Sequence, residues 1–361
     1  MQIAKNKPMK ESQYREIRDR ISYSSLKLFY LDRQTFYKNI IVGERNVVRK
    51  NDDMILGDLV DCLFFTPEEF DSKFSIASCN KPTGQLGELC DEIYQCTLKF
   101  VDEENNVTES FSSIFDEAVN NLKRAGKFKG KESSSILKLF TSPDKDGVIA
   151  KDYYDECRRN FKKTPVDHKI VGYAQKVIDN IKESQNLASK ILFDETDEDH
   201  EVINQLAVLF QVKGLDFKCM MDKVIIDHKT KTIRMYDLKV TWQNEDFMAN
   251  FLKMYYYLQL GVYTLGIWEW MKNDRPDLKD YEIEPFSFIT ADSSSRTYPI
   301  VYKSNEEWLQ KSLYGFTLPT GKRFKGVFEL VDEINFHLKE GNWKSSKEVL
   351  ENNGLLELIN I

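Results

Sequence analysis

The sequence predicts a mixed α/β protein, in which a mixed central sheet is flanked by helices. Segments 202–212, 215–227 and 232–241 are rich in β-branched and aromatic residues and are separated by turn residues, which is typical of consecutive antiparallel strands. Residues 245–272 form a long apolar stretch that predicts one helix, and strand-like sequence returns at 284–303. A strand, strand, strand, helix, strand order favours helices packed against a sheet.

Length and charge limit the possible organisation of the chain. Its 361 residues exceed the size of a usual single core, about 250–300 residues. We therefore expect a leader over 1–20 and one domain over 21–361 that carries a helical insertion or lobe at about 75–195. The net charge of −7 argues against a protein that coats nucleic acid, but it is compatible with an enzyme that has a local basic groove and an acidic metal centre.

The sequence also indicates a compartment. It contains no apolar run of about 20 residues, and its polar N-terminus has no secretory signal, so we expect a cytoplasmic protein without a membrane segment. None of the six cysteines forms a C-x-x-C pair, which makes a zinc ribbon or a redox motif unexpected. Disulfides are also unexpected in a cytosolic chain.

The N-terminal half predicts mainly helices. A mobile or loosely helical leader comes first, and a short helix then begins near Ser24 or Ser25, either of which is a suitable cap. Residues 54–64 read as a buried helix. The following segments to about residue 195 alternate between helical patterns and polar loops, and the last fifty residues read as mostly helical.

Two carboxylates stand out on the predicted hairpin. If its turn is centred on Lys229 and Thr230, antiparallel pairing places Asp222 opposite Asp237, with Cβ atoms about 4.5–5.5 Å apart. Two such carboxylates repel unless a cation lies between them, and Mg²⁺, with ligand distances of about 2.0–2.1 Å, would suit them. This pairing depends on the register, because a slip of one residue would break it.

A lysine lies two positions beyond the second carboxylate. Strand periodicity places Asp237 and Lys239 on one face, and the carbonyl of Leu238 could add an oxygen ligand. Lys239 could position or deprotonate the attacking water, or stabilise charge on a phosphate. The metal would lower the pKa of that water. The alternative is an ordinary solvated strand face, on which charges also alternate.

Two further positions have a functional and a structural interpretation. Gln259 and Tyr263 share one face of the predicted helix, and a buried glutamine requires a partner such as water, a DNA phosphate or a catalytic side chain. The alternative is a core glutamine bonded to backbone. Asp61, four residues after Gly57 in an apolar helix, is a candidate third metal ligand or one half of a structural salt bridge.

The order of these motifs resembles a known superfamily. The succession G-x-x-x-[H/D], then D, then [D/E]-x-K, then Q-x-x-x-Y resembles the PD-(D/E)XK nucleases, and within them the RecE-like exonucleases of the exodeoxyribonuclease VIII group of phages and prophages. GDLVDCLFFTPEEF resembles the helix and the proline-acidic segment of that group. YDLKVTWQNEDFMANFLKMYYYLQLGVY resembles its catalytic strand, linker and helix. The likeness covers about residues 21–70 and 200–310.

The resemblance implies a role for each residue. Asp222 and Asp237 would bind metal, Lys239 would be the catalytic lysine, and Gln259 and Tyr263 would lie near the active site and DNA. Asp61 stands where many relatives have a metal-binding histidine, and aspartate also binds Mg²⁺ or Mn²⁺.

Two more expectations come from the resemblance. YSSLKLF resembles the serine-containing opening helix of RecB-type nuclease domains, which makes Ser24, Ser25 and Lys27 candidate DNA contacts. Relatives with an iron–sulfur cluster hold it with four cysteines. Here no cysteine follows Cys219 and Asp32 stands near the first position, so no cluster is expected.

The function that the resemblance implies is a Mg²⁺-dependent deoxyribonuclease that digests linear double-stranded DNA from its ends, 5′ to 3′, in phage recombination or replication. Its expected partners are DNA ends and a phage single-strand annealing protein, in the cytoplasm of a bacterial host. A homo-oligomeric ring is plausible for this group. Two alternatives stay open: an endonuclease or RecB-like nuclease module serving a helicase or spacer-acquisition complex, and an inactive DNA-binding or packaging protein.

Overall fold

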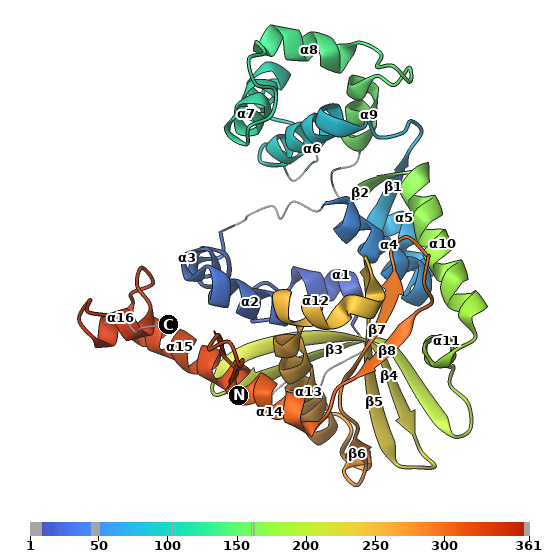
Figure 1. Ribbon diagram of the computed structural model, residues 1–361, viewed down its shortest axis with the longest axis vertical. Helices are drawn as coiled ribbons and strands as arrows, with labels where there is room; N and C mark the ends of the chain where they lie inside the picture. Colours follow the sequence, from blue (N-terminus) through green and yellow to red (C-terminus); the bar gives the residue numbers. More distant parts are fainter. Residues whose placement is uncertain are drawn as a thin grey trace. The chain divides into compact units, whose positions relative to one another are not determined.

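A computed structural model describes residues 9–44, 51–102, 104, 106–159, 161 and 163–356 (Figure 1). The chain separates into two compact units. Unit 1 comprises Met1–Asn46, Ile181–Asp292 and Arg296–Ile361, and unit 2 comprises Val47–Asn180 with Ser293–Ser295. In the part of the chain that is described, no helix is both long and apolar enough to span a bilayer.

Unit 1 is built on a mixed sheet, as the sequence predicts. The strand order is β3-β4-β5-β7-β8, and the short strand β6 pairs with one end of β5. All neighbours on the main path are antiparallel except β5 and β7, which are parallel. The strands are β3 (His200–Val212), β4 (Leu215–Asp227), β5 (Thr232–Thr241), β6 (Glu282–Ile283), β7 (Ser287–Asp292) and β8 (Ile300–Lys303).

The β4–β5 hairpin has the predicted register. Its ladder runs from Asp227 opposite Thr232 to Lys223 opposite Tyr236, which centres the turn on Lys229 and Thr230 and confirms the expectation. The ladder ends there, and the next position on each strand is one of the two aspartates.

The strand alternation shifts at this same point. Gln205 of β3 lies between the paired residues Asn204 and Leu206 and has a positive φ of 53°, which is uncommon outside glycine. On β4 the side chains that enter the main core change from odd to even positions at Asp222. Those side chains are Phe217, Cys219 and Met221 before it and Val224 and Ile226 after it. A strictly alternating strand could not place Met221 and Val224 in the same core.

The predicted single helix over 245–272 is wrong, because the structure divides it. A 3₁₀ turn (Asn244–Asp246) leads into α12 (Phe247–Lys253), and α13 (Tyr256–Asn273) follows after a break. Tyr255 at the break is left-handed, with φ of 60°. Its ring packs edge-on against Tyr30, with centroids 5.1 Å apart, and Tyr23 donates its hydroxyl to the carbonyl of Met254 (2.6 Å). These tertiary contacts offset a backbone conformation that costs about 1–3 kcal/mol.

The N-terminal segment is attached to the sheet. The helix α2 (Tyr23–Leu31) begins after Ser22, whose hydroxyl accepts the N–H of Ser25, so the predicted cap at Ser24 or Ser25 is wrong by two or three residues. Before it, α1 (Glu11–Glu16) is held by Lys218 of β4. The Lys218 ammonium donates to the carbonyl of Tyr14 (2.9 Å) and lies 4.4 Å from its ring centroid.

The C-terminal helices complete the core of unit 1. A short hairpin joins α14 to α15, and the buried face of α15 enters the same apolar cluster as α13. The elements are α14 (Glu306–Tyr314), β9 (Phe316–Thr317), β10 (Arg323–Phe324), α15 (Val327–Glu340) and α16 (Lys347–Glu351).

Close packing between α13 and the sheet depends on Gly266. A Cβ atom at this position would lie 2.4 Å from Cys219 Sγ and 3.3 Å from the ring of Phe210. We therefore expect Gly266→Ala to lower the free energy of unfolding by about 1–3 kcal/mol. Gly172 lies in the helix α10 (His168–Ser184) with open space around it, so Gly172→Ala should be neutral or stabilising by up to about 1 kcal/mol. Thermal unfolding of both variants tests this prediction. If their melting temperatures shifted by the same amount, close packing at Gly266 would be contradicted.

Unit 2 is mainly helical and includes a two-stranded parallel sheet of β1 (Phe74–Ala77) and β2 (Thr164–Asp167). Its own apolar cluster is formed mostly by α6 to α9. The helices are α4 (Asp52–Phe65), α5 (Phe70–Lys73), α6 (Gly84–Leu98), α7 (Phe111–Arg124), α8 (Ser133–Thr141), α9 (Ala150–Cys157) and α10 (His168–Ser184); α11 (Leu187–Leu192) belongs to unit 1. The expected lobe at about 75–195 covers most of unit 2, which also contains α4. That the two units form one domain stays a prediction.

Candidate active site

An acid pair lies where the β4–β5 ladder ends. Asp222 is 9% exposed and Asp237 is 2% exposed. One carboxylate oxygen of Asp222 accepts the backbone N–H of Leu238 (2.8 Å), and the other lies 3.4 Å from Gln205 Nε2. The two carboxylates are therefore both buried and lie close enough for the charge of Asp237 to act on Asp222.

Two side chains hold the second carboxylate. Asp237 Oδ1 accepts a hydrogen bond from Gln259 Nε2 of α13 (2.5 Å), and its Oδ2 forms an ion pair with the Lys239 ammonium. The ammonium also lies 5.3 Å from the ring centroid of Tyr256. The structure thus brings together Asp222, Asp237, Lys239 and Gln259 from β4, β5 and α13.

Burial or neighbouring charges raise the pKa of all three charged groups in this cluster. Burial, then the charge of Asp237 and a smaller contribution from Glu11 of α1 together raise the pKa of Asp222 to about 8, although Lys239 and the N–H of Leu238 oppose them. Burial also raises the pKa of Asp237, although Lys239 and Gln259 oppose it. For Lys239, burial alone would lower the pKa, but Asp237, Tyr256 and Asp222 more than offset it, so the ammonium stays charged.

Oxygen atoms suited to a hard cation gather around the pair. The side-chain carbonyl oxygens of Gln205 and Gln259 are buried and accept no hydrogen bond from any described residue. Unsatisfied buried acceptors are costly, and a divalent cation would satisfy them while it neutralises the carboxylates. Among the described residues, no three acidic, histidine or cysteine side chains form a metal-binding group. The donors present, two carboxylates and two amide oxygens, fit an ion such as Mg²⁺, which keeps several waters and needs only one or two carboxylates.

Tyr263 lies one helical turn beyond Gln259 and extends the same face. Its ring packs edge-on against Phe286, with centroids 5.5 Å apart. Burial, and then the charge of Asp237, hold the pKa of its hydroxyl well above the usual value. The Tyr263 hydroxyl is therefore a permanent hydrogen-bond donor next to the acid pair.

Sequence reasoning missed Gln205 and Glu11. Gln205 is a polar residue inside an apolar strand, and that was the available signal, but its left-handed backbone is not visible in the sequence. Glu11 falls in the segment expected to be a leader. Its approach to Asp222 depends on the anchoring of α1 to β4, which no local pattern reveals.

The remaining predicted positions stay predictions. Asp61 lies on α4 of unit 2, whereas the acid pair lies in unit 1, so its role as a metal ligand is untested. Among the candidate DNA contacts, the hydroxyl of Ser25 accepts the backbone N–H of Ser22 (2.6 Å) and is already used in the helix cap. Ser24 is exposed, and burial lowers the pKa of the half-buried Lys27.

The hydrogen bond from Gln259 gives a testable prediction. Gln259→Leu keeps the size of the side chain but removes the donor to Asp237 Oδ1, so we expect activity to fall about 10–100-fold, as for other groups that orient metal ligands. Thr264→Val is the matched control, because Thr264 is equally buried on the same helix and bonds only to its own backbone turn. If both variants lost the same amount of activity, Gln259 would act by stabilising the helix and not by orienting Asp237.

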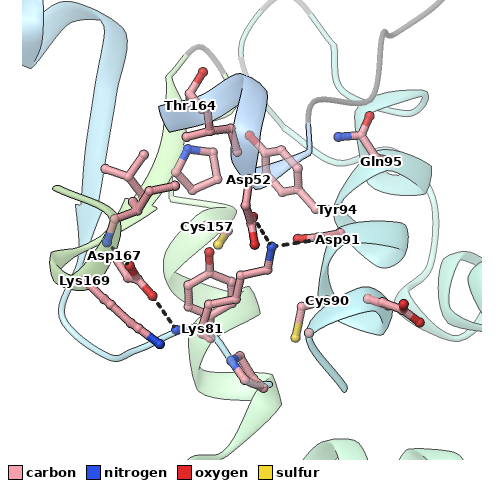
Figure 2. A pocket seen from close by; sticks show the side chains of 18 of the residues that line it. Asp52, Lys81, Cys90, Asp91, Tyr94, Gln95, Cys157, Thr164, Asp167 and Lys169 are labelled. Carbon is pink, nitrogen blue, oxygen red and sulfur yellow. Dashed lines mark hydrogen bonds and ion pairs between the residues drawn. The ribbon is translucent and has the colours of Figure 1, made fainter. Parts of the chain in front are cut away.

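Unit 2 contains a pocket of about 640 Å³ that the sequence did not indicate (Figure 2). Lys81 projects into it and pairs with Asp52 (2.7 Å) and Asp91 (2.9 Å). Tyr94 stacks on Phe161 along one wall, with centroids 5.6 Å apart. Two carboxylates thus neutralise the Lys81 ammonium, and Lys163 and Lys169 are the other basic residues of the lining.

Comparisons with known proteins add little to this geometry. No protein-family model matches the chain, and no curated protein sequence matches it. Among solved structures, the chain resembles that of a candidate exonuclease from Eubacterium rectale, with a TM-score of 0.44 and 12% identity over 99% of this chain and 97% of that one. A likeness at this TM-score carries no argument about fold or function, and the functional reasoning therefore starts from the acid pair.

Proposed function

We propose that the protein is a metal-dependent deoxyribonuclease with a PD-(D/E)XK core, and that the acid pair is its catalytic centre. One observation carries this proposal: two buried carboxylates, a charged lysine and an orienting glutamine meet at one point from three separate elements. Burial raises the pKa of both carboxyl groups, and Asp237 adds to the shift of Asp222, so this pair is costly to fold unless the site uses it.

The proposed roles follow from the contacts. Asp222 and Asp237 would hold Mg²⁺ or Mn²⁺, with the carbonyl of Leu238 and the carboxylate of Asp61 as further ligands. The bound ion would polarise the scissile phosphate and lower the pKa of a water molecule. Gln259 fixes the rotation of the Asp237 carboxylate through its bond to Oδ1.

The structure favours one of the two roles considered for Lys239. Because the neighbouring Asp237 and Asp222 raise its pKa, the side chain is held as an ammonium ion, which suits a hydrogen-bond donor better than a general base. It would therefore stabilise the charge that develops on the phosphate rather than act as a general base. Tyr263, on the same helix face as Gln259, would contact the substrate.

The finer proposal concerns the substrate. The motif resemblance supports an exonuclease that digests linear double-stranded DNA 5′ to 3′ in phage recombination or replication, in the cytoplasm of a bacterial host. A phage single-strand annealing protein would receive its product, and the enzyme could act as a ring-shaped homo-oligomer without an iron–sulfur cluster. An endonuclease or RecB-like module, and an inactive DNA-binding or packaging protein, remain the alternatives. The charged lysine beside the acid pair favours an enzyme.

A digestion assay separates these proposals. Linear duplex labelled at its 5′ or 3′ ends is incubated with Mg²⁺, with Mn²⁺ or with a chelator, and closed circular DNA serves as the control. An exonuclease of the proposed polarity releases the 5′ label first and leaves the circle intact. A nicked circle would identify an endonuclease. DNA that is bound but never cut with either metal would identify the inactive binding protein.

A further inference from the structure

An exposed aromatic side chain follows the strand that carries Asp237 and Lys239. Trp242 comes directly after β5 and is 54% exposed, although tryptophan is a large apolar residue that is mostly buried in folded proteins. The guanidinium of Arg296 lies over its indole, with the central carbon 3.9 Å from the ring centroid. An arginine stacked on a half-exposed tryptophan forms a flat surface that is both aromatic and cationic.

The loops on both sides of this surface are fixed by buried polar contacts. Asn244 is fully buried, donates to the carbonyl of Tyr298 (2.8 Å) and accepts from the Thr297 hydroxyl (2.6 Å). The buried carboxylate of Asp292 accepts the backbone N–H of Arg296 (3.0 Å). Because buried polar groups must keep their partners, these bonds hold both loops in one arrangement. The backbone that carries Trp242 and Arg296 is therefore positioned by groups other than their own side chains.

The surface lies where an open sheet usually binds ligands. Thr241 of β5 pairs with Asp292 at the carboxyl ends of the two parallel strands, and ligand sites in such sheets gather at this end. Trp242 is three residues beyond Lys239, so the two Cα atoms are at most about 10 Å apart. A DNA strand covers that distance in about three nucleotide steps.

The charge around the surface points to a base rather than a phosphate. Glu245 and Asp246 follow Trp242 closely, and Arg296 Nε lies 3.8 Å from the Asp292 carboxylate. These acids reduce the attraction for phosphate. Arg296 covers one face of the indole, and the other face can stack on a base, an interaction that depends little on sequence.

We propose that Trp242 and Arg296 form a stacking platform for a nucleobase at an unpaired DNA end, about three nucleotides from the bond that is cut. This inference rests on the proposed nuclease function and adds a substrate-binding site to it. The platform would select strands whose terminal bases can leave the duplex.

The test measures binding in a Lys239→Ala background, so that the DNA stays intact. Fluorescence anisotropy gives the affinity for a duplex with a short single-stranded overhang and for a blunt duplex of the same sequence. We expect Trp242→Ala to weaken binding of the overhang duplex roughly 5- to 100-fold, the range for loss of one stacked base. Trp242→Phe should keep most of the affinity, because phenylalanine also stacks. Arg296→Lys should weaken binding, because lysine cannot form the planar stack.

Controls distinguish stacking from other effects. Trp268, 41% exposed on α13, is the matched control, and Trp268→Ala should leave the affinity unchanged. Tryptophan fluorescence should be quenched by the overhang duplex, and this quench should disappear in Trp242→Phe. The salt dependence of binding should be the same in Trp242→Ala and in the parent chain, because a stacked base releases no counterions.

The outcomes separate this inference from the proposed function. If the unmodified chain cuts DNA but Trp242→Ala binds the overhang duplex as tightly as its parent, the platform is refuted and the nuclease stands. If DNA binding by Trp242→Ala depended less on salt than binding by its parent, the contact at Trp242 would be to a phosphate and not to a base. That result would also refute the platform. If the unmodified chain neither binds nor cuts DNA, the proposed function fails and the platform fails with it.

Discussion

Lys239→Ala is expected to reduce DNA cleavage by about 10²–10⁴-fold while the affinity for duplex DNA stays within about threefold of the parent chain. The reason is that the ammonium, held charged by Asp237 and Asp222, would stabilise charge that appears mainly in the transition state. Loss of a contact of this kind lowers turnover more than binding. The measurement is single-turnover cleavage of end-labelled duplex, together with binding by anisotropy.

This variant also leaves the buried Asp237 without its ion-pair partner, so a lower melting temperature is expected in a chelator. Cleavage must therefore be measured well below the unfolding transition. Lys229→Ala is the control, because Lys229 is an exposed lysine in the turn of the same hairpin. If Lys239→Ala cut DNA at the rate of the parent chain, Lys239 would have no catalytic role. The main argument for an enzyme at this site would then be lost.

Asp222→Asn should stabilise the metal-free protein and inactivate it at the same time. The pKa of Asp222 is raised to about 8 from 3.8, so the folded state prefers the protonated carboxyl. Stability of the parent chain should therefore fall as the pH rises from about 4 to about 8, and Asp222→Asn should remove this loss. At pH 7 in a chelator, we expect a gain on the order of 1–3 kcal/mol. The asparagine oxygen can still accept the N–H of Leu238, and the amide of Gln205 can turn over to accept the new N–H.

Melting temperatures measured with added Mg²⁺ complete this test. Mg²⁺ should raise the melting temperature of the parent chain, because it binds the folded state, and should have little effect on Asp222→Asn. Asp227→Asn, at the other end of β4, is the matched control with the opposite sign. Its carboxylate accepts the N–H groups of Lys229 and Thr230, and the bond from Thr230, together with nearby Arg234, lowers its pKa, so this substitution should destabilise. Two results together would contradict a metal site at Asp222. Asp222→Asn would be less stable than the parent chain in a chelator, and Mg²⁺ would raise the melting temperatures of both proteins equally.

The sequence predicted the parts of the site that follow from local rules. The alternation of β4 and β5 and the short turn between them fix the register, and the register places Asp222 and Asp237 on neighbouring strands. The 3.6-residue period likewise places Gln259 and Tyr263 on one helical face. The mixed sheet with flanking helices follows from the same patterns.

The parts that it did not predict depend on tertiary contacts. The break at Tyr255 contains no glycine or proline, and packing on Tyr30 stabilises it. The shift in alternation at Asp222 occurs together with the left-handed Gln205 of the neighbouring strand, so neither strand reveals it alone. The pocket around Lys81 is assembled from separate segments of unit 2, and residues in such segments carry no shared spacing.

The parallel pairing of β5 and β7 has a consequence for the newly made protein. The β4–β5 hairpin is local and can close early, whereas Asp237 pairs with Phe288 only after α12 and α13 have been synthesised and packed. Contacts between distant segments form late, because the entropy of closing a long loop must be overcome first. Gln259 lies on α13, so its hydrogen bond to Asp237 also forms only after that helix has packed. A chain still emerging from the ribosome would therefore hold both acids before the contact between Gln259 and Asp237 has formed.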